Sequence, residues 1–410
     1  MRPRPALPIS FLFVLALAIT IIFAPQASAG TENVLHSFDI KDGYYPHGGV
    51  VFDQAGNLYG ATFYGGSHNC ENNGCGVVFK LIPNGDGSWS EQAIYTFTGG
   101  TDGSHPYSDL VFDAAGNLYG TTYGNYYGGT GWGTAFRLTP GADGSWQFSL
   151  LHTFGAGKDG ARPYGMLAID KSGNLYGSTT IGGSHNAGIA FELSPASGSW
   201  TETLLHTFTG GQDGSAPIGV LLGPGGNIYG AAEQGGLGYG VIFELSLGSN
   251  GTWKETVLYS LTNTPGGSIP TSLTLDASGN IYAAAAGGGS STYCYNGCGL
   301  VFRLSPQSNG KYKYTPLHSF NGGGGDDPSA LILDSAGNLY GAAYTGGNGM
   351  GLIFELNPNA DWKETVIYEF TEALGGEPVA PLTFDASGDL YGTAVYGGAG
   401  GGGVVFEVTP

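Results

Sequence analysis

Short apolar runs alternate with glycine-rich polar turns along almost the whole chain, in a pattern that repeats seven times. In the first copy an apolar run reaches Phe52, residues 53–60 hold a turn on Gly56 and Asn57, and a second run opens at Leu58. An aspartate at turn entry accepts backbone amides, and glycine or asparagine tolerates positive φ, so each copy predicts a tight β-hairpin. The other six copies occupy residues 113–120, 170–177, 223–230, 276–283, 334–341 and 385–392.

Two further columns of the pattern predict two more strands in every unit. The hairpin supplies strands a and b. A Gly-x-x-Phe segment predicts strand c, at residues 76–79, 133–136, 188–191, 240–243, 299–302, 351–354 and 403–406. Strand d is predicted at residues 93–97, 150–154, 204–208, 257–261, 316–320 and 366–370. Four short antiparallel strands in each of seven units predict an all-β, seven-bladed β-propeller.

The strand counts balance only if the ring closes on its N-terminal segment. The seventh unit has no strand d of its own, whereas residues 34–38 have the sequence of a strand d and no unit before them. We therefore expect this N-terminal strand to complete the last blade, which removes an open sheet edge. The linkers between units are short, so residues 30–410 form a single predicted propeller domain.

Residues 1–29 have the features of a cleavable signal peptide. Arg2 and Arg4 precede an apolar run at residues 9–23, and Ala27 and Ala29 frame a small-residue cleavage site. No other apolar run approaches the roughly 18 residues needed to span a bilayer. We expect a mature chain from Gly30 that is secreted or periplasmic, without a membrane span.

The charge balance narrows the classes of partner. The formal net charge is −19, and 11% of the residues are charged. Nucleic acids and anionic membranes attract basic patches, so neither is an expected partner. We expect a monomer that binds a carbohydrate or protein ligand.

The four cysteines form two local pairs, Cys70 with Cys75 and Cys294 with Cys298. In an exported protein such pairs usually form disulfides. A metal site shared by the two pairs is the alternative, although four repeats separate them in the sequence.

The Gly-x-x-Phe column, combined with Asp-x-x-Gly-Asn-Leu-Tyr-Gly, resembles the GloVer tandem repeat of exported bacterial proteins, and the resemblance covers residues 34–410. It implies no established activity. Members typically carry a C-terminal anchoring signal, and we expect none here because the sequence ends at Pro410 without one. The hairpin motif is more weakly similar to propellers of the NHL, gluconolactonase and virginiamycin B lyase type. Some of these are enzymes with a divalent metal near the central channel, but a scaffold motif implies only a fold.

The eight histidines divide into two groups. Four share the strand d column with tyrosines and are expected to be structural: His36, His152, His206 and His318. The others lie in d–a loops (His47, His105) or b–c loops (His68, His185), which emerge on the same face of a propeller. Histidine with loop aspartates such as Asp102, Asp159 and Asp213 suits metal binding or acid–base chemistry. The alternative is that Asp-Gly is turn chemistry and the histidines are incidental.

Aromatic residues gather in the same loops. Five tryptophans and Tyr312 occupy one column at the start of strand d, which predicts packing between blades: Trp89, Trp146, Trp200, Trp253 and Trp362. Trp132 lies outside this column, in the b–c loop of the second unit, close to Tyr126 and Tyr127. Aromatic rings beside aspartate and glycine suit stacking on a sugar or peptide. Packing at the ends of strand b is the alternative interpretation.

The sequence contains no serine nucleophile elbow, phosphate-cradling loop, His-Glu-x-x-His motif or calcium loop. We therefore predict an exported, non-enzymatic propeller that binds a partner or a carbohydrate or cell-envelope ligand through its d–a/b–c loop face, without a cofactor. The alternative is a metal-assisted lyase or hydrolase near the channel mouth, with a divalent cation and a catalytic residue among His47, His68, His105 and His185.

Overall fold

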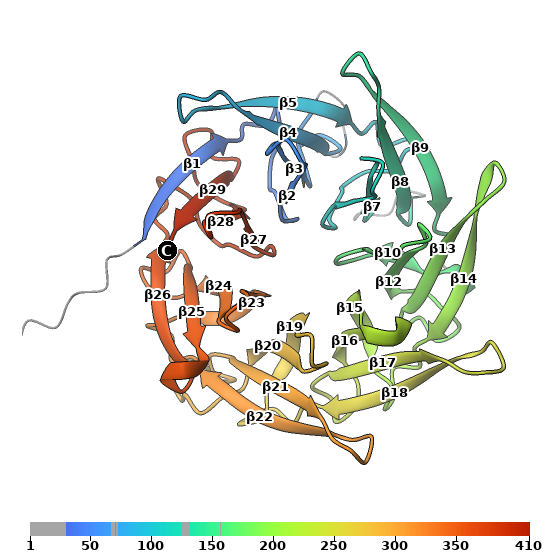
Figure 1. The fold of residues 1–410 in the computed structure, drawn as a ribbon, viewed down its shortest axis with the longest axis vertical. Coiled ribbons are helices and arrows are strands. Elements are labelled where there is room, and N and C mark those ends of the chain that lie inside the picture. Colours follow the sequence, from blue (N-terminus) through green and yellow to red (C-terminus); the bar gives the residue numbers. More distant parts are fainter. Residues whose placement is uncertain (1–29, 67–69, 71–72, 125–130, 156) are drawn as a thin grey trace, which may run out of the picture.

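The computed structural model describes residues 30–66, 70, 73–124, 131–155 and 157–410. Seven antiparallel sheets stand around a central channel, with strand a of each sheet nearest the channel and strand d on the outside (Figure 1). The all-β, seven-bladed propeller predicted from the repeat is confirmed. The expected signal peptide, residues 1–29, lies outside the described residues and stays a prediction.

The first four blades follow the chain. Blade 1 holds β2 (Val51–Phe52), β3 (Leu58–Thr62), β4 (Val77–Pro83) and β5 (Trp89–Thr96). Blade 2 holds β6 (Val111–Phe112), β7 (Leu118–Thr122), β8 (Thr134–Pro140) and β9 (Trp146–Thr153). Blade 3 holds β10 (Ala161–Pro163), β11 (Ala168–Ile169), β12 (Leu175–Ile181), β13 (Ile189–Ala196) and β14 (Ser199–Thr207). Blade 4 holds β15 (Ser215–Leu222), β16 (Ile228–Gln234), β17 (Val241–Leu247) and β18 (Trp253–Ser260).

The remaining blades complete the ring. Blade 5 holds β19 (Ser268–Leu275), β20 (Ile281–Gly287), β21 (Leu300–Pro306) and β22 (Tyr312–Ser319). Blade 6 holds β23 (Asp326–Leu333), β24 (Leu339–Thr345), β25 (Leu352–Asn357) and β26 (Lys363–Glu369). Blade 7 holds β27 (Thr383–Phe384), β28 (Leu390–Ala394), β29 (Val404–Thr409) and β1 (Thr31–Ser37). The described helical segments are single 3-10 turns at Gly157–Asp159, Pro224–Gly226 and Pro358–Ala360.

The N-terminal strand closes the ring. β1 pairs antiparallel with β29, from Thr31 opposite Thr409 to Ser37 opposite Val404. Figure 1 shows β1 as the outer strand of the blade that β27, β28 and β29 build from the C-terminal end of the chain. The predicted closure is therefore confirmed.

The repeated aspartate shapes the a–b turn. In blade 2, Asp113 Oδ1 accepts the amides of Ala115 and Asn117, both at 2.9 Å. Its second oxygen accepts Asn117 Nδ2 at 2.7 Å and the Tyr119 hydroxyl at 3.0 Å. Gly116 has a φ of +82°, the left-handed conformation that glycine adopts without strain. One carboxylate thus satisfies four donors, which explains why Asp, Gly, Asn and Tyr recur together.

The Gly-x-x-Phe column builds the core. The strand c phenylalanines are fully buried in all seven blades: Phe79, Phe136, Phe191, Phe243, Phe302, Phe354 and Phe406. A Cβ added at Gly60 would come within 2.5 Å of the Phe79 ring, so the glycine of strand b makes room for the phenylalanine of strand c. The tryptophan column packs between blades as predicted, for example Trp146 of blade 2 against Tyr59 of blade 1, with ring centroids 5.7 Å apart.

Both predicted disulfides are formed. Cys70 is bonded to Cys75 and Cys294 to Cys298, with Cα atoms 4.9 and 5.1 Å apart. Each bridge ties together a b–c loop, in blades 1 and 5 respectively. Within the described part of the chain, no helix has the length and apolar character to cross a membrane.

Strand a carries a bulge before it reaches the turn. In blade 2 the chain advances five residues from Pro106 to Val111 while the partner strand advances three, from Thr122 back to Tyr119. In blade 4 the corresponding advance is three residues against two. Blades 1, 3 and 7 share the longer spacing between this proline and the turn, and blades 5 and 6 share the shorter one. A larger bulge re-aims side chains at the inner rim, where the channel lies.

Candidate functional site

A ring of seven residues in an unusual backbone conformation surrounds the channel on the d–a/b–c face. Each precedes a proline at or near the beginning of strand a, and each is a non-glycine residue with a φ between 53° and 64°. We call them the channel-mouth ring: Tyr45, His105, Arg162, Ala216, Ile269, Asp327 and Glu377.

A repeated hydrogen bond holds the channel-mouth ring in place. The amide of each ring residue donates to the carbonyl of the residue before the glycine of the Gly-x-x-Phe segment in the preceding blade, at 2.7–3.3 Å. His105 donates to Cys75, for example, and Arg162 donates to Trp132. The left-handed region costs an L-residue roughly 1–2 kcal/mol. Each of the seven ring residues therefore has a strained backbone that its hydrogen bond and the surrounding packing must hold in place.

The side chains of the channel-mouth ring differ in every blade. The His105 imidazole is fully buried, stacks on Phe63 with centroids 4.7 Å apart, and has Nδ1 3.0 Å from the Gly124 carbonyl oxygen. The Arg162 guanidinium lies 5.4 Å from the centre of the Tyr123 ring. Ile269, by contrast, is 49% exposed. One backbone frame therefore presents aromatic, cationic, anionic and aliphatic groups around the channel.

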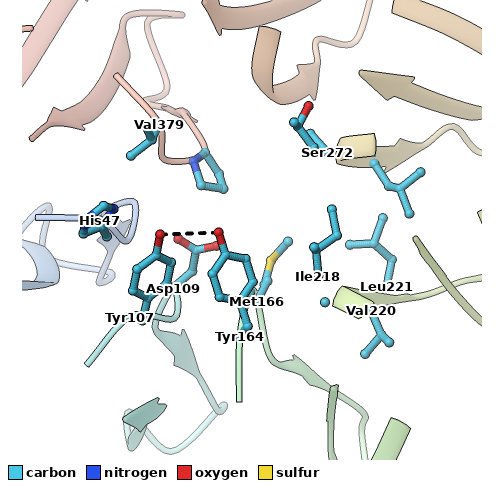
Figure 2. A pocket seen from close by; sticks show the side chains of 15 residues that line it. His47, Tyr107, Asp109, Tyr164, Met166, Ile218, Val220, Leu221, Ser272 and Val379 are labelled. Atoms are coloured by element: carbon cyan, nitrogen blue, oxygen red, sulfur yellow. Dashed lines mark hydrogen bonds between the residues drawn. The ribbon is translucent and has the colours of Figure 1, made fainter. Parts of the chain in front are cut away.

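A cavity of about 140 Å³ opens within the channel, lined by residues of strand a and the loops that lead into it (Figure 2). One side is aromatic. His47 stacks on Tyr107 with centroids 4.5 Å apart, and Tyr107 stacks on Tyr164 at 4.6 Å. The two tyrosine hydroxyls are 3.3 Å apart, the contact drawn as a dashed line in Figure 2. The other side is aliphatic and includes Met166, Ile218, Val220, Leu221, Leu273 and Val379.

Burial sets the charge state of the cavity. It lowers the pKa of His47 to about 4, which keeps the imidazole neutral at pH 7. Burial also raises the pKa of Asp109 to about 6, although the Gly49 amide donates to its Oδ1 at 2.6 Å and opposes the shift. At neutral pH the cavity therefore contains a desolvated carboxylate beside neutral aromatic rings.

The candidate histidines occupy different environments. His47 lines the cavity, whereas His105 is buried in the channel-mouth ring, and both rings contact Phe63. His185 is exposed in the b–c loop of blade 3, where its Nδ1 is 2.9 Å from the Ser184 hydroxyl. His68 lies outside the described residues. The three described candidates thus lie at three different depths of the d–a/b–c face.

The candidate aspartates form hydrogen bonds within their own loops. Asp102 accepts the Tyr95 hydroxyl at 3.0 Å. Asp159 lies 3.0 Å from His152 Nε2, and Asp213 lies 3.2 Å from His206 Nε2. Each also accepts a loop amide: Thr98, Gly155 and Thr209 at 2.8, 2.7 and 2.9 Å. These contacts join each d–a loop to the histidine or tyrosine of strand d, as a structural role for that column requires.

Of the candidate aromatic residues, Trp132 is 38% exposed. Its carbonyl accepts the Arg162 amide at 2.7 Å, which places it beside the channel-mouth ring. Tyr126 and Tyr127 lie outside the described residues.

Among the described residues, two groups of three have metal-ligand types close together. In the first, Cys294 and Cys298 are already joined as a disulfide beside Asp326. The second consists of His152, Asp159 and Glu202, at the outer seam between blades 2 and 3. Neither group includes a candidate histidine of the channel mouth.

Sequence reasoning singled out His105 but missed the other six members of the channel-mouth ring, and it missed the cavity residues Tyr107, Asp109 and Tyr164. A signal for them exists, because a proline stands six or seven residues before every repeated turn. The residue after this proline lines the cavity in six of the seven blades: His47, Tyr107, Tyr164, Ile218, Thr271 and Val379.

The repeat itself assigns the family. The Gloeobacter/Verrucomicrobia repeat model matches residues 20–201, 124–312 and 291–410. The chain belongs to this repeat family. The resemblance noted from the Gly-x-x-Phe and turn motifs is thereby confirmed for this Gloeobacter/Verrucomicrobia repeat protein. No curated protein gives a significant match to the chain.

Solved propellers share the fold at low identity. The extracellular domain of a proposed one-component system from B. thetaiotaomicron aligns with 89% of this chain and 39% of its own, at 13% identity and a TM-score of 0.55. PorZ, a surface component of the type-IX secretion system of Porphyromonas gingivalis, aligns with 91% of this chain and 47% of its own, at 14% identity and a TM-score of 0.54. This chain thus spans less than half of either relative. A gluconolactonase from Xanthomonas campestris aligns with 92% of this chain and 89% of its own, at 14% identity and a TM-score of 0.45.

Proposed function

We propose that this protein is an exported, non-enzymatic propeller that binds carbohydrate of the cell envelope through its d–a/b–c face. The distribution of exposed apolar side chains carries the proposal. Of the twelve large hydrophobic residues exposed in the described chain, nine lie in or at the edge of d–a and b–c loops: Ile40, Trp132, Leu237, Tyr239, Ile269, Tyr293, Tyr295, Leu374 and Tyr396. Leu150 and Leu204 lie on outer strands, and Leu247 ends a strand on the opposite face. Apolar groups gathered on one face mark interaction surfaces.

The composition of this surface favours a neutral, hydroxyl-rich ligand. Five of the nine residues are aromatic, and tyrosine and tryptophan combine a flat apolar ring with a polar tip, which suits stacking on sugar rings. They come from blades 2, 4, 5 and 7, so the surface extends around the channel mouth and matches an extended polymer. A protein partner is the competing occupant.

Three observations support export. The two disulfides are typical of oxidising compartments outside the cytosol. The N-terminal sequence predicts a signal peptide. Two structural relatives with TM-scores above 0.5 are described as an extracellular domain and as a surface component.

Affinity electrophoresis of residues 30–410 through gels containing neutral polysaccharides tests the proposal. We expect retardation by at least one polysaccharide, and at least a tenfold loss of affinity in a Trp132→Ala, Tyr239→Ala double variant, since central aromatic anchors carry more than about 1 kcal/mol each. Leu247→Ala, on the opposite face, is the matched control and should migrate like the parent. Retention of a peptide library with no retardation by any polysaccharide would instead assign the surface to a protein partner.

One residue of the cavity, His47, also fits the alternative function, a metal-assisted lyase or hydrolase. A metal-assisted lyase or hydrolase needs a base at the channel mouth, and burial holds the His47 imidazole in its neutral, proton-accepting form, with a lowered pKa. Metal analysis of the purified protein tests this alternative directly. Stoichiometric divalent metal in the parent that is lost in His47→Ala and His105→Ala would favour it, whereas equal metal content in all three proteins would exclude these two ligands.

A further inference from the structure

We propose that the channel cavity is a second binding site, separate from the polysaccharide surface, for a small organic cation: an ammonium group attached to a compact apolar body. The proposal goes beyond carbohydrate binding, since it concerns the residues that line the channel rather than the exposed loops.

The first argument is charge. Among the fifteen residues that line the cavity there is no lysine or arginine, and Asp109 is the lining residue that carries a charge at neutral pH. Its Oδ1 accepts the Gly49 amide at 2.6 Å, a bond that only partly offsets removal of the carboxylate from water. A ligand that brings a positive charge into the cavity would neutralise Asp109, whereas an anionic ligand would repel it.

The second argument is the aromatic side of the cavity. His47, Tyr107 and Tyr164 form a stack of rings, and Figure 2 shows the hydroxyl groups of the two tyrosines turned toward the open space. In the pair of tyrosine hydroxyls, one donates to the other, so lone pairs on both oxygens remain able to accept from an ammonium N–H.

The third argument is size and the apolar wall. A cavity of about 140 Å³ is close to the ~150 Å³ that accommodates a benzene ring in an apolar site. Met166, Ile218 and Leu221 provide apolar contacts for the body of such a ligand. Calcium needs six to eight oxygen ligands, and a lining with a single carboxylate supplies too few charged ones. The cavity therefore fits an amphipathic amine better than a bare metal ion.

Isothermal titration calorimetry at pH 8 with three matched probes tests the site. Benzylamine, benzyl alcohol and benzoate share a ring and differ in charge. We expect benzylamine to bind at least tenfold more tightly than benzyl alcohol, and benzoate to give no heat of binding. Asp109→Asn should reduce benzylamine affinity at least tenfold, whereas Asp143→Asn, in an exposed turn, should leave it unchanged.

Two further variants keep the outcome interpretable. Tyr164→Phe removes one hydroxyl and should weaken benzylamine several-fold, which preserves the test if Asp109→Asn fails to fold. The Trp132→Ala, Tyr239→Ala double variant should keep full benzylamine affinity, so failure of polysaccharide binding and failure of the cavity site are distinguishable. Equal affinities for benzylamine and benzyl alcohol, or unchanged benzylamine affinity in both Asp109→Asn and Tyr164→Phe, would overturn the proposal.

Discussion

The scaffold of each blade and the channel-mouth ring differ in what is repeated from blade to blade. In the scaffold, strand c keeps a fully buried phenylalanine in all seven blades, and six of the seven a–b turns keep an aspartate. In the channel-mouth ring, the backbone conformation is repeated seven times while the residue is different each time. Where the side chain is packed in the core, as for the strand c phenylalanine, the residue is the same in every blade. Where the chain enters strand a at the channel mouth, the backbone conformation is constant and the side chain varies from blade to blade.

Asp109 and Asp113 show the same contrast within five residues of blade 2. Four donors surround the Asp113 carboxylate, and hydrogen bonds from Asn117, Tyr119 and Ala115 lower its pKa against the opposing effect of burial. The Asp109 carboxylate accepts the Gly49 amide and is otherwise desolvated, so its pKa is raised. We therefore expect Asp113 to stabilise the fold and the ionised Asp109 to destabilise it.

The largest expected effect comes from the constant part of the scaffold. Phe243→Ala removes a fully buried ring from the core of blade 4 and should lower the free energy of unfolding by about 3–5 kcal/mol, because a cavity remains where the ring was. Urea denaturation of the two proteins measures the difference. Ile269→Ala, in the channel-mouth ring, is the control and should change stability by less than about 0.5 kcal/mol. A similar loss in both variants would contradict the division between scaffold and ring.

Asp109→Asn should stabilise the protein at neutral pH. The folded-state pKa of Asp109 is raised from 3.8 to about 6, so ionisation destabilises the native state. The penalty is absent below the unfolded-state pKa, grows as pH rises through about 4 to 6, and is constant above. Asparagine keeps an oxygen that accepts the Gly49 amide, so its advantage should reach about 1–3 kcal/mol by pH 7.

Urea denaturation of the parent and Asp109→Asn at pH 4, 5, 6 and 7 checks this dependence. An advantage that is equal at pH 4 and pH 7 would show that desolvation of the charge is not its cause. A destabilised variant at pH 7 would show that Asp109 belongs to the scaffold.

The same substitution at the turn position, Asp113→Asn, should have the opposite sign. It would place an amide NH₂ group against Asn117 Nδ2 and the Tyr119 hydroxyl, which now donate to the Asp113 carboxylate. Loss of these bonds should destabilise the protein by about 1–2 kcal/mol at pH 7. Since the pKa of Asp113 is lowered, the parent's advantage should disappear as pH falls below the unfolded-state value of about 4 through the folded-state pKa. Parallel denaturation curves for the two asparagine variants compare the signs directly.

The sequence predicted the fold because its determinants are local and repeated. The turn, the buried phenylalanine and the strand d column each lie within one unit, and the unmatched strand at residues 34–38 was enough to predict ring closure. The disulfides also followed from short spacings between cysteines.

The sequence predicted which face of the propeller carries the site but not which residues form it. Those residues come from different blades, and only closure of the ring brings them together. Loop position assigned His47, His105 and His185 to the same face but carried no information on how deeply each side chain is buried. The turn-like Gly-x-Asp-Gly pattern of the d–a loops did not show that their aspartates bind the strand d histidines and tyrosines. Asp109 gave no signal at all, since an aspartate beside an apolar strand is ordinary until its surroundings are known.

The smallest expected effect tests whether the channel-mouth ring is strained. Ala216 has a φ of +53°, in the left-handed region that costs an L-residue roughly 1–2 kcal/mol, whereas glycine adopts it freely. The greater freedom of glycine in the unfolded chain offsets part of this gain, so Ala216→Gly should stabilise the protein by about 0.5–1 kcal/mol. Ala231→Gly, within β16, is the matched control and should destabilise, because a glycine in a strand interior loses packing and gains nothing from its backbone freedom. Destabilisation by both changes would mean that the conformation at Ala216 is not strained. Stabilisation by Ala216→Gly alone would mean that the ring retains side chains in a backbone conformation better suited to glycine, as a frame maintained for recognition would require.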